Sequence, residues 1–402
     1  MSKRVKAIIF SASLLVAAFA VMGGLNVRAA GINKNEGAYR QIGVYSEVLS
    51  RIRSEYVEEP NLGLVTNGAL HGLLESLDPD SSYLNAEEYK VYKAHKSDGK
   101  GDIGATVSKP FGYAAVISVI PGGPADKAQI HNGDIIEAID GKSTREMSLA
   151  EVHNLVTGEP GSNVNFSLVR ARRAEPQKVT VTRAVVSVPA SSEKMMEANV
   201  GYIKVFAFNK GKAQEIASRI RSLEHAGAKK LILDLRNVSS GEPQEGISTA
   251  NLFLSRGAIA SLSGQKYKRE DFSADAQKAV TSLPLVVLVN RGTAGPAEIV
   301  AAAILDNTRG DVLGEKTFGE GSVQKVIEMP DGAALILSVA KYHSPSGKSI
   351  QDDAVTPNIT VAQEPDFGID EDETPQTPET NPQNAPDEQL RRAIEVLKNR
   401  PS

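Results

Sequence analysis

The sequence predicts a multi-domain α/β protein made of an N-terminal helical segment, a small partly open β-barrel and an α/β core. Three observations predict this fold class. Apolar residues recur at helical spacing near the N-terminus, and short alternating runs split by turns fill residues 98–188. Strands then alternate with helices from Asn199 to Val361. A chain of 402 residues, of which 41% are hydrophobic, is long enough for several packed cores.

The first 30 residues have the pattern of an export signal. Lys3, Arg4 and Lys6 precede the uncharged stretch "AIIFSASLLVAAFAVMGGLNV". The small residues Val27 and Ala29 fit a leader-peptidase site, whereas an apolar run of this length also suits a single membrane anchor. We therefore expect an exported protein of the periplasm or cell envelope, either released or anchored by residues 1–30.

Residues 31–97 are expected to form a helical domain. In "YRQIGVYSEVLSRIRSEYV" one helical face carries five apolar side chains: Ile42, Tyr45, Leu49, Ile52 and Tyr56. A second helix, "LVTNGALHGLLESL", should end at "DPDSSYL", where Pro79 follows an aspartate.

The partly open β-barrel is expected in residues 98–188, and the α/β core in residues 189–362. The barrel strands are "YAAVISVI", "DIIEAIDG", "NVNFSLVRAR" and "KVTVTRAVV", with one helix at "SLAEVHNLVTG". The core strands are "VGYIKVFAF", "KKLILDLRN", "LPLVVLVN" and "ALILSVAKY", and its helices include "GKAQEIASRIRSLEHAG" and "GPAEIVAAAILDN".

The end of the chain has a different composition. Residues 363–386 are acidic and rich in Pro and Thr without an apolar face, which predicts a disordered linker. In residues 387–402, "DEQLRRAIEVLKNR" predicts a short amphipathic helix. We expect so short a helix to fray in solvent, with docking on its own chain or on a partner as the alternative.

Composition excludes several classes of function. The net charge of −4, from 45 basic and 49 acidic residues, gives no polycationic surface for nucleic acid. The absence of cysteine excludes disulfides, thiolate metal sites and a cysteine nucleophile. The six histidines lack the paired spacing of a metal site, so we expect neither a metal nor a cofactor.

The barrel segment carries a recognisable motif. "SVIPGGPADKAQIHNGDIIEAIDGKS", from Ser118 to Ser143, resembles the PDZ domains of exported bacterial proteases. Such domains add a peptide as an extra strand and hold its terminal carboxylate with backbone N–H groups of a glycine-bearing loop. The matching loop here is "KGDIGATV", so the resemblance implies that Asp102, Ile103 and Gly104 bind the peptide carboxylate. The alternative is that these residues form only a turn.

With this segment placed, the chain from about Tyr39 to Val361 resembles the carboxyl-terminal processing peptidases, also called tail-specific proteases. Four hallmarks occur in the family's order: "SLDPDSSYL", "LILDLRN", "GEKTFGEGSVQ" and "AKYHSPSGKSIQ". The resemblance implies a serine nucleophile, a lysine base and a supporting glutamine. A lysine can accept the serine's proton only where burial lowers its pKa enough to keep it neutral.

Both catalytic positions depart from the family. The family string G-S-A-S-A-S-E-I corresponds to "GTAGPAEI", so Gly295 stands at the nucleophile position. F-G-K-G-S-V-Q corresponds to "FGEGSVQ", so Glu320 stands at the base position while the glutamine is retained as Gln324. The family's "LRNNPGG" segment, whose amides contribute to the oxyanion hole, reads "LRNVSSG", with Ser239 and Ser240 as further departures.

Relocated catalytic groups are an alternative. Thr293 lies two residues before Gly295, Ser322 lies two after Glu320, and Lys316 and Lys325 flank the base position. A shift of two residues moves a side chain several ångströms, often to another face, whereas nucleophile and base must lie within hydrogen-bond reach.

These residues also have structural interpretations. Thr293 fits a helix N-cap before "GPAEIVAAAIL", with Pro296 in the first turn and Glu298 near the positive helix end. Asp234 and Arg236 fit a structural pair at a strand end.

The sequence therefore supports three hypotheses. The first is an exported pseudoprotease that binds unfolded or C-terminal protein tails through its PDZ domain without cutting them, alone, as a homo-oligomer or beside an active paralogue. The second is an active serine- or threonine-type endopeptidase with relocated groups that cleaves proteins near their C-termini. The third is a structural component of the cell envelope.

Overall fold

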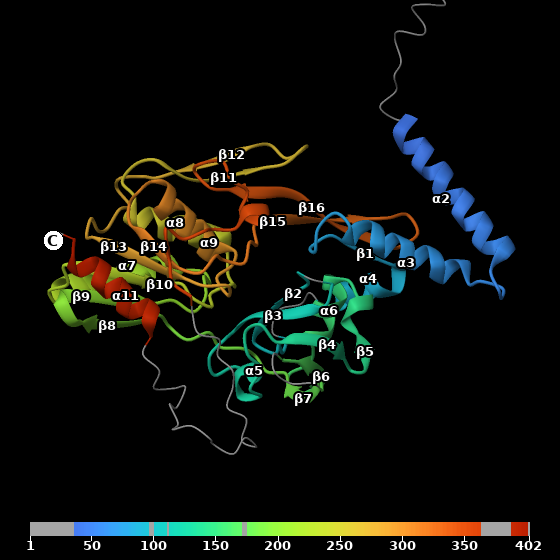
Figure 1. The fold of residues 1–402 in the computed structure, drawn as a ribbon, viewed down its shortest axis with the longest axis horizontal. Coiled ribbons are helices and arrows are strands. Elements are labelled where there is room, and N and C mark those ends of the chain that lie inside the picture. The colour runs from blue at the N-terminus through green and yellow to red at the C-terminus, as the bar shows by residue number, and fades with distance from the viewer. Residues whose placement is uncertain (1–35, 96–99, 111, 171–174, 363–386, 401–402) are drawn as a thin grey trace, which may run out of the picture. The chain divides into compact units, whose positions relative to one another are not determined.

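The computed structural model describes residues 36–95, 100–110, 112–170, 175–362 and 387–400, which divide into one compact unit up to Ala69 and another from Leu70 onward (Figure 1). The predicted export signal and the predicted linker lie outside the described residues. Within the described ranges, no helix combines the length and the apolar character needed to cross a lipid bilayer.

The first unit contains the predicted N-terminal helices. Helix α2 spans Glu36–Glu55 and α3 spans Leu62–Glu75, which continues into the second unit. Arg51 pairs with Glu47 at 2.9 Å and with Glu55 at 2.8 Å along α2. The apolar stripe of α2 is largely exposed, with Tyr39 at 69% and Ile42 at 61%.

In the second unit, residues 100–184 form an antiparallel barrel-like sheet in the order β2-β3-β4-β6-β7, with β5 paired to β4. The strands are β2 (Ala105–Ser108), β3 (Ala114–Val119), β4 (Ile135–Ile139), β5 (Lys142–Ser143), β6 (Asn163–Val169) and β7 (Gln177–Thr182). Helices α5 (Pro124–Lys127) and α6 (Leu149–Val156) accompany them, with a 3₁₀ turn at Thr144–Glu146. Strand β2 ends the sheet, so its outer edge has no strand partner among the described residues.

The α/β core is built on a six-stranded sheet in the order β17-β14-β13-β10-β9-β8, parallel except for β8. Its strands are β8 (Ser192–Met196), β9 (Val200–Lys204), β10 (Lys230–Asp234), β13 (Leu285–Val289), β14 (Asp311–Gly314) and β17 (Ile359–Thr360). Strands β10 and β13 are buried throughout, as their continuous apolar runs predict for a parallel sheet covered on both faces. One face of this sheet packs against the apolar sides of three helices: α7 (Lys212–His225), α8 (Pro243–Phe253) and α9 (Pro296–Asp306). A 3₁₀ turn at Glu197–Asn199 connects β8 to β9.

A second sheet joins distant parts of the chain in the order β1-β16-β11-β12, with β15 also paired to β16. Its strands are β1 (Ser82–Leu84), β11 (Ala258–Ser263), β12 (Glu270–Ser273), β15 (Ser322–Glu328) and β16 (Ala334–His343), with helices α4 (Ala86–His95) and α10 (Ile350–Asp353) nearby in sequence. Pairing of Ser82 with Ile336 brings the "SLDPDSSYL" segment to the strands that follow Glu320.

The C-terminal helix corrects one expectation. Helix α11 (Glu388–Lys398) docks on the other face of the six-stranded sheet (Figure 1) and buries Ala393, Ile394 and Leu397 against it. Lys230 Nζ donates to the Leu397 carbonyl at 2.6 Å. The prediction of a frayed helix was therefore wrong and the alternative of docking on its own chain is confirmed, because packing of an amphipathic face stabilises a helix too short to persist alone.

Candidate active site

The structure brings the two predicted catalytic positions together on one buried side chain. The Gly295 N–H donates to Glu298 Oε2 at 3.0 Å, and the Glu320 N–H donates to the same oxygen at 2.8 Å. Glu298 lies in the first turn of α9 and is fully buried. The chain segments expected to carry nucleophile and base are therefore neighbours, which is the arrangement that a two-residue catalytic unit requires.

Glu298 accepts hydrogen bonds from several segments of the site, whereas the sequence predicted only its position near the positive end of the helix. It also accepts the Gly319 N–H at 2.8 Å and the hydroxyl of Thr317. Burial raises the pKa of Glu298 to about 8, and this effect outweighs the hydrogen bonds that favour the carboxylate. One side chain thus fixes the start of α9 against the loop before β15.

Gly295 keeps a backbone conformation that disfavours any other residue. Its φ of 59° and ψ of −122° lie where L side chains are strained. A Cβ at this position would meet only the Ser239 carbonyl oxygen, at the ordinary contact distance of 3.6 Å. The site has room for a Cβ atom, and glycine removes the backbone strain that a serine would impose.

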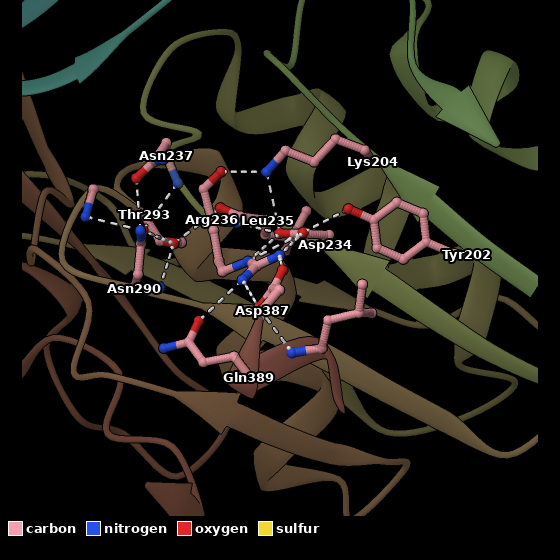
Figure 2. Close-up of polar contacts among 12 residues, drawn as sticks. Tyr202, Lys204, Asp234, Leu235, Arg236, Asn237, Asn290, Thr293, Asp387 and Gln389 are labelled. Carbon is pink, nitrogen blue, oxygen red and sulfur yellow. Dashed lines mark hydrogen bonds and ion pairs between the residues drawn. The ribbon is translucent and has the colours of Figure 1, made fainter. Parts of the chain in front are cut away.

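Thr293 corrects a second expectation. Helix α9 takes Gly295 as its N-cap, and the buried Thr293 hydroxyl instead donates to the Leu235 carbonyl at 2.9 Å and accepts the Asn290 N–H at 3.0 Å. Figure 2 shows these contacts between the end of β10 and the loop after β13. A hydroxyl with no exposure cannot meet a substrate, so the geometry gives Thr293 a structural role.

Glu320 lies among acidic groups rather than beside a nucleophile. Burial, and then the charge of Asp80, raise the pKa of Glu320 to about 7. Its Oε2 is buried and has no hydrogen-bond partner in the described part of the chain. Asp80 accepts from Ser322 Oγ at 2.8 Å and from Gln351 Nε2 at 3.1 Å, and burial is also the main cause of the raised pKa of Asp80.

Asp80 was not identified as a site residue from the sequence. The signal was present in "SLDPDSSYL", but its place beside Glu320 depends on strand β1 joining the distant strand β16. The retained Gln324 donates to Ser322 Oγ at 2.7 Å, and Lys316 and Lys325 are exposed. The base position is therefore surrounded by carboxyl, hydroxyl and amide groups.

The loop that should stabilise an oxyanion is also changed. Gly241, with a φ of 126°, runs so close to Phe208 that a Cβ would lie 2.4 Å from its carbonyl carbon. Ser239 is buried, and its hydroxyl donates to Thr106 Oγ1 at 2.6 Å and also contacts Ser118. The amide after a nucleophile commonly supplies an oxyanion donor, and here that residue is Pro296, which has no N–H. From the sequence, Pro296 was predicted only to lie in the first turn of the helix.

Asp234 and Arg236 form part of a buried network that ties α11 to this loop (Figure 2). Arg236 donates to Asp234 from Nε at 3.0 Å and to Asp387 from its two terminal nitrogens at 2.8 and 2.7 Å. Burial would raise the pKa of Asp234, but the positive charges of Lys204 and Arg236 outweigh burial and hold it well below its usual range. This agrees with the predicted structural pair and adds Asp387 as its unforeseen partner.

The predicted carboxylate-binding loop is occupied by its own chain. The Asp102 N–H donates to the Ala184 carbonyl at 2.9 Å, and the Gly104 N–H donates to Asp102 Oδ1 at 2.6 Å. Ile103 is 1% exposed and belongs to the hydrophobic core of this domain. The three predicted residues lie together, but two of their amides already have partners.

Comparison with known proteins places these features in a family. Residues 199–361 match Peptidase family S41, and residues 116–170 match the PDZ domain. The carboxy-terminal-processing protease of Bartonella bacilliformis is 31% identical over 363 residues, covering 89% of this chain and 83% of the relative. The chain belongs to the carboxy-terminal processing proteases.

Further relatives agree with this assignment. The carboxy-terminal processing protease CtpA of Bacillus subtilis is 34% identical over 335 residues, covering 82% of this chain and 71% of the relative. Among solved structures, the photosystem II D1 C-terminal processing protease aligns with a TM-score of 0.66 and 27% identity, covering 79% of this chain and 86% of that one. The predicted resemblance and the multi-domain α/β fold class are confirmed. Gly295 and Glu320, the predicted nucleophile and base positions, both lie within the segment that matches this serine-type peptidase family.

Proposed function

We propose that this carboxy-terminal processing protease homologue binds unfolded or C-terminal protein tails through its PDZ domain and does not hydrolyse them. The observation that carries the proposal is the convergence of Gly295 and Glu320 on Glu298 Oε2. Because this contact places the two altered positions side by side, the substitutions remove both halves of one catalytic unit.

The chemistry lost at the site is specific. Glycine has no side-chain atom that could attack a carbonyl, and the nearby Ser322 hydroxyl donates to Asp80 rather than to Glu320. A carboxylate at that position would also repel the negative charge that develops on a tetrahedral intermediate. Pro296 lacks the amide that could offset this charge.

The cellular setting belongs to the same proposal. The basic and apolar pattern of residues 1–30 supports export to the periplasm or cell envelope, with that segment cleaved or kept as an anchor. A chain that holds tails without cutting them suits an adaptor, acting as a homo-oligomer or beside an active paralogue. The net charge of −4 gives no polycationic surface for nucleic acid, which favours protein tails as the partners.

The test compares the full chain with two restored variants on an unfolded casein-like substrate and on tail peptides. One variant carries Gly295→Ser and Glu320→Lys, and the other adds Pro296→Ala. We expect the unmodified chain to bind peptide and cut nothing, and the triple variant to exceed the double variant by about 10²-fold in kcat, the usual effect of one oxyanion donor.

The competing endopeptidase hypothesis makes the opposite prediction. Cleavage by the unmodified chain would refute the proposal, and the Ser322 contact with Asp80 at 2.8 Å makes Ser322 the relocated nucleophile to examine first. Loss of that cleavage in Ser322→Ala, with Thr293→Ala as the buried-hydroxyl comparison, would then establish a relocated site.

A further inference from the structure

The loop before strand β2 holds a carboxylate of its own where a peptide carboxylate is expected. Asp102 Oδ1 accepts the Gly104 N–H at 2.6 Å, a short distance for a bond between a backbone amide and a charged acceptor. The neighbouring Asp102 N–H is engaged by the Ala184 carbonyl at 2.9 Å, and the Ala184 N–H returns a bond to the Asp102 carbonyl at 3.1 Å.

The surrounding backbone holds this arrangement in place. The Ile103 carbonyl accepts the Ala125 N–H at 2.7 Å, and the Gly104 carbonyl accepts the Ile120 N–H at 2.8 Å. Gly104 has a φ of +73°, and a Cβ there would lie 3.2 Å from Pro124 Cδ. Because Ile103 is also anchored in the core, the loop cannot turn to present other amides without breaking these contacts.

The Asp102 charge has no compensating ion pair among the described residues. The nearby Arg183 directs its guanidinium at the carbonyls of Val156, Leu155 and Asn163 and at Ser162 Oγ. Burial raises the pKa of Asp102, while the Gly104 N–H and the charges of His153 and Arg183 oppose this rise. A second carboxylate entering the loop would meet an occupied donor and a like charge at close range.

The strand edge beside the loop suits a different mode of binding. Strand β2 ends its sheet and has no strand partner on its outer edge within the described ranges, while the His153 imidazole on α6 already occupies the Val107 carbonyl at 3.1 Å. An extended peptide pairs with such an edge through main-chain hydrogen bonds that need no chain terminus.

We propose that Asp102 makes this PDZ domain select extended segments that lack a free carboxylate at the loop, so that it reads the interior of a tail rather than its last residue. This proposal rests on the proposed tail-binding function and names the part of the tail that is recognised. It assigns to Asp102 the role of a specificity-determining residue.

The test measures binding of one peptide sequence in two forms, free acid and C-terminal amide, by fluorescence anisotropy with the full chain at pH 7.5. The unmodified chain should bind the amide about ten-fold more tightly, because the acid meets the Asp102 charge. Asp102→Asn removes the charge and keeps the acceptor, so the difference should vanish. Asp102→Ala frees the Gly104 N–H as well, and the acid should become the tighter ligand by about ten-fold.

A matched control is available in the same domain. Asp126 Oδ2 accepts the Gly122 N–H at 2.7 Å, so Asp126→Asn makes the same chemical change on the neighbouring helix α5, without touching the Gly104 N–H. This variant should keep the preference of the unmodified chain. A preference for the free acid in the unmodified chain, equal to that of Asp102→Ala, would overturn the proposal.

A second measurement separates this proposal from the tail-binding function. Hydrogen exchange at the Gly104 amide, followed by NMR without peptide, should accelerate about ten-fold in Asp102→Ala relative to the unmodified chain and to Asp102→Asn. An unchanged rate refutes the role of Asp102. Failure of every variant to bind either peptide, with the exchange behaving as expected, refutes the tail-binding function instead.

Discussion

Replacing Glu320 by Gln should stabilise the chain at pH 8 and have a much smaller effect on its stability at pH 5. Burial and the charge of Asp80 raise the pKa of Glu320 from 4.5 to about 7. A carboxyl with a raised folded-state pKa makes its full contribution to stability below pH 4.5 and loses it as the pH rises through 7. At pH 8 the folded chain therefore carries nearly the whole cost of ionising a partly buried carboxyl whose Oε2 is inaccessible to solvent.

The size of the effect follows from the pKa difference. At about 1.4 kcal/mol per pKa unit, the rise corresponds to an upper limit of about 3 kcal/mol at pH 8. Glutamine keeps the shape of the side chain and leaves one polar atom without a partner, as the Oε2 of Glu320 already is. We expect a gain of about 2 kcal/mol in the free energy of unfolding at pH 8 and less than about 1 kcal/mol at pH 5.

The assay is urea unfolding followed by circular dichroism at both pH values, because the chain contains no tryptophan to report by fluorescence. Glu242→Gln is the control, since Glu242 is exposed at the start of α8 and makes no side-chain cap hydrogen bond. The control should change stability equally at the two pH values. An equal effect of Glu320→Gln at pH 5 and pH 8 would refute the reasoning.

Two further predictions concern the fold around the site. Asp387→Ala removes the cap on the Leu390 N–H and both bonds to Arg236, so docking of α11 should weaken by about 2 kcal/mol and hydrogen exchange in residues 388–398 should accelerate. Glu388→Ala, which loses only an exposed pair with Arg391, is the comparison, and equal exchange in the two variants would show that the Arg236 contact contributes nothing. Gly241→Ala should lower stability by at least about 2 kcal/mol because its Cβ would meet the Phe208 backbone at 2.4 Å. Gly227→Ala is the comparison, because Gly227 has a φ of +99° but a Cβ there would meet nothing within 4 Å, so this variant should show backbone strain alone, about 1 kcal/mol. Equal thermal midpoints for the Gly241→Ala and Gly227→Ala variants would show that the Phe208 clash contributes nothing.

The sequence predicted those parts of the site that depend on motif spacing. The interval between Gly295 and Glu320 placed both at the altered catalytic positions, and the structure brings them to one oxygen. The alternation of strands and helices likewise predicted the α/β core, whose central strands β10 and β13 are buried throughout.

Long-range contacts determined what the sequence did not predict. Thr293 has the propensity of an N-cap, but a buried bond to Leu235 competes for its hydroxyl and Gly295 takes the cap position. Helix α11 looked too short to persist, yet the apolar sheet face and the second carboxylate that Arg236 binds hold it in place. In the predicted carboxylate-binding loop, the sequence could not show that Asp102 would occupy the Gly104 amide, because this contact depends on the conformation of the loop.

The two catalytic substitutions differ in their effect on stability. At position 295 glycine is favoured by the backbone, because φ is 59° and a serine would be strained there even though its side chain has room. At position 320 an apolar side chain of similar size would avoid the cost of a buried carboxyl with an unpartnered oxygen beside Asp80. Relief of backbone strain is therefore a sufficient explanation for glycine at position 295. It does not explain Glu320, because this carboxyl raises the free energy of the folded chain above about pH 7. In the restored variants, the serine at position 295 should reintroduce backbone strain, so we expect any gain of activity to come with a loss of stability at that position.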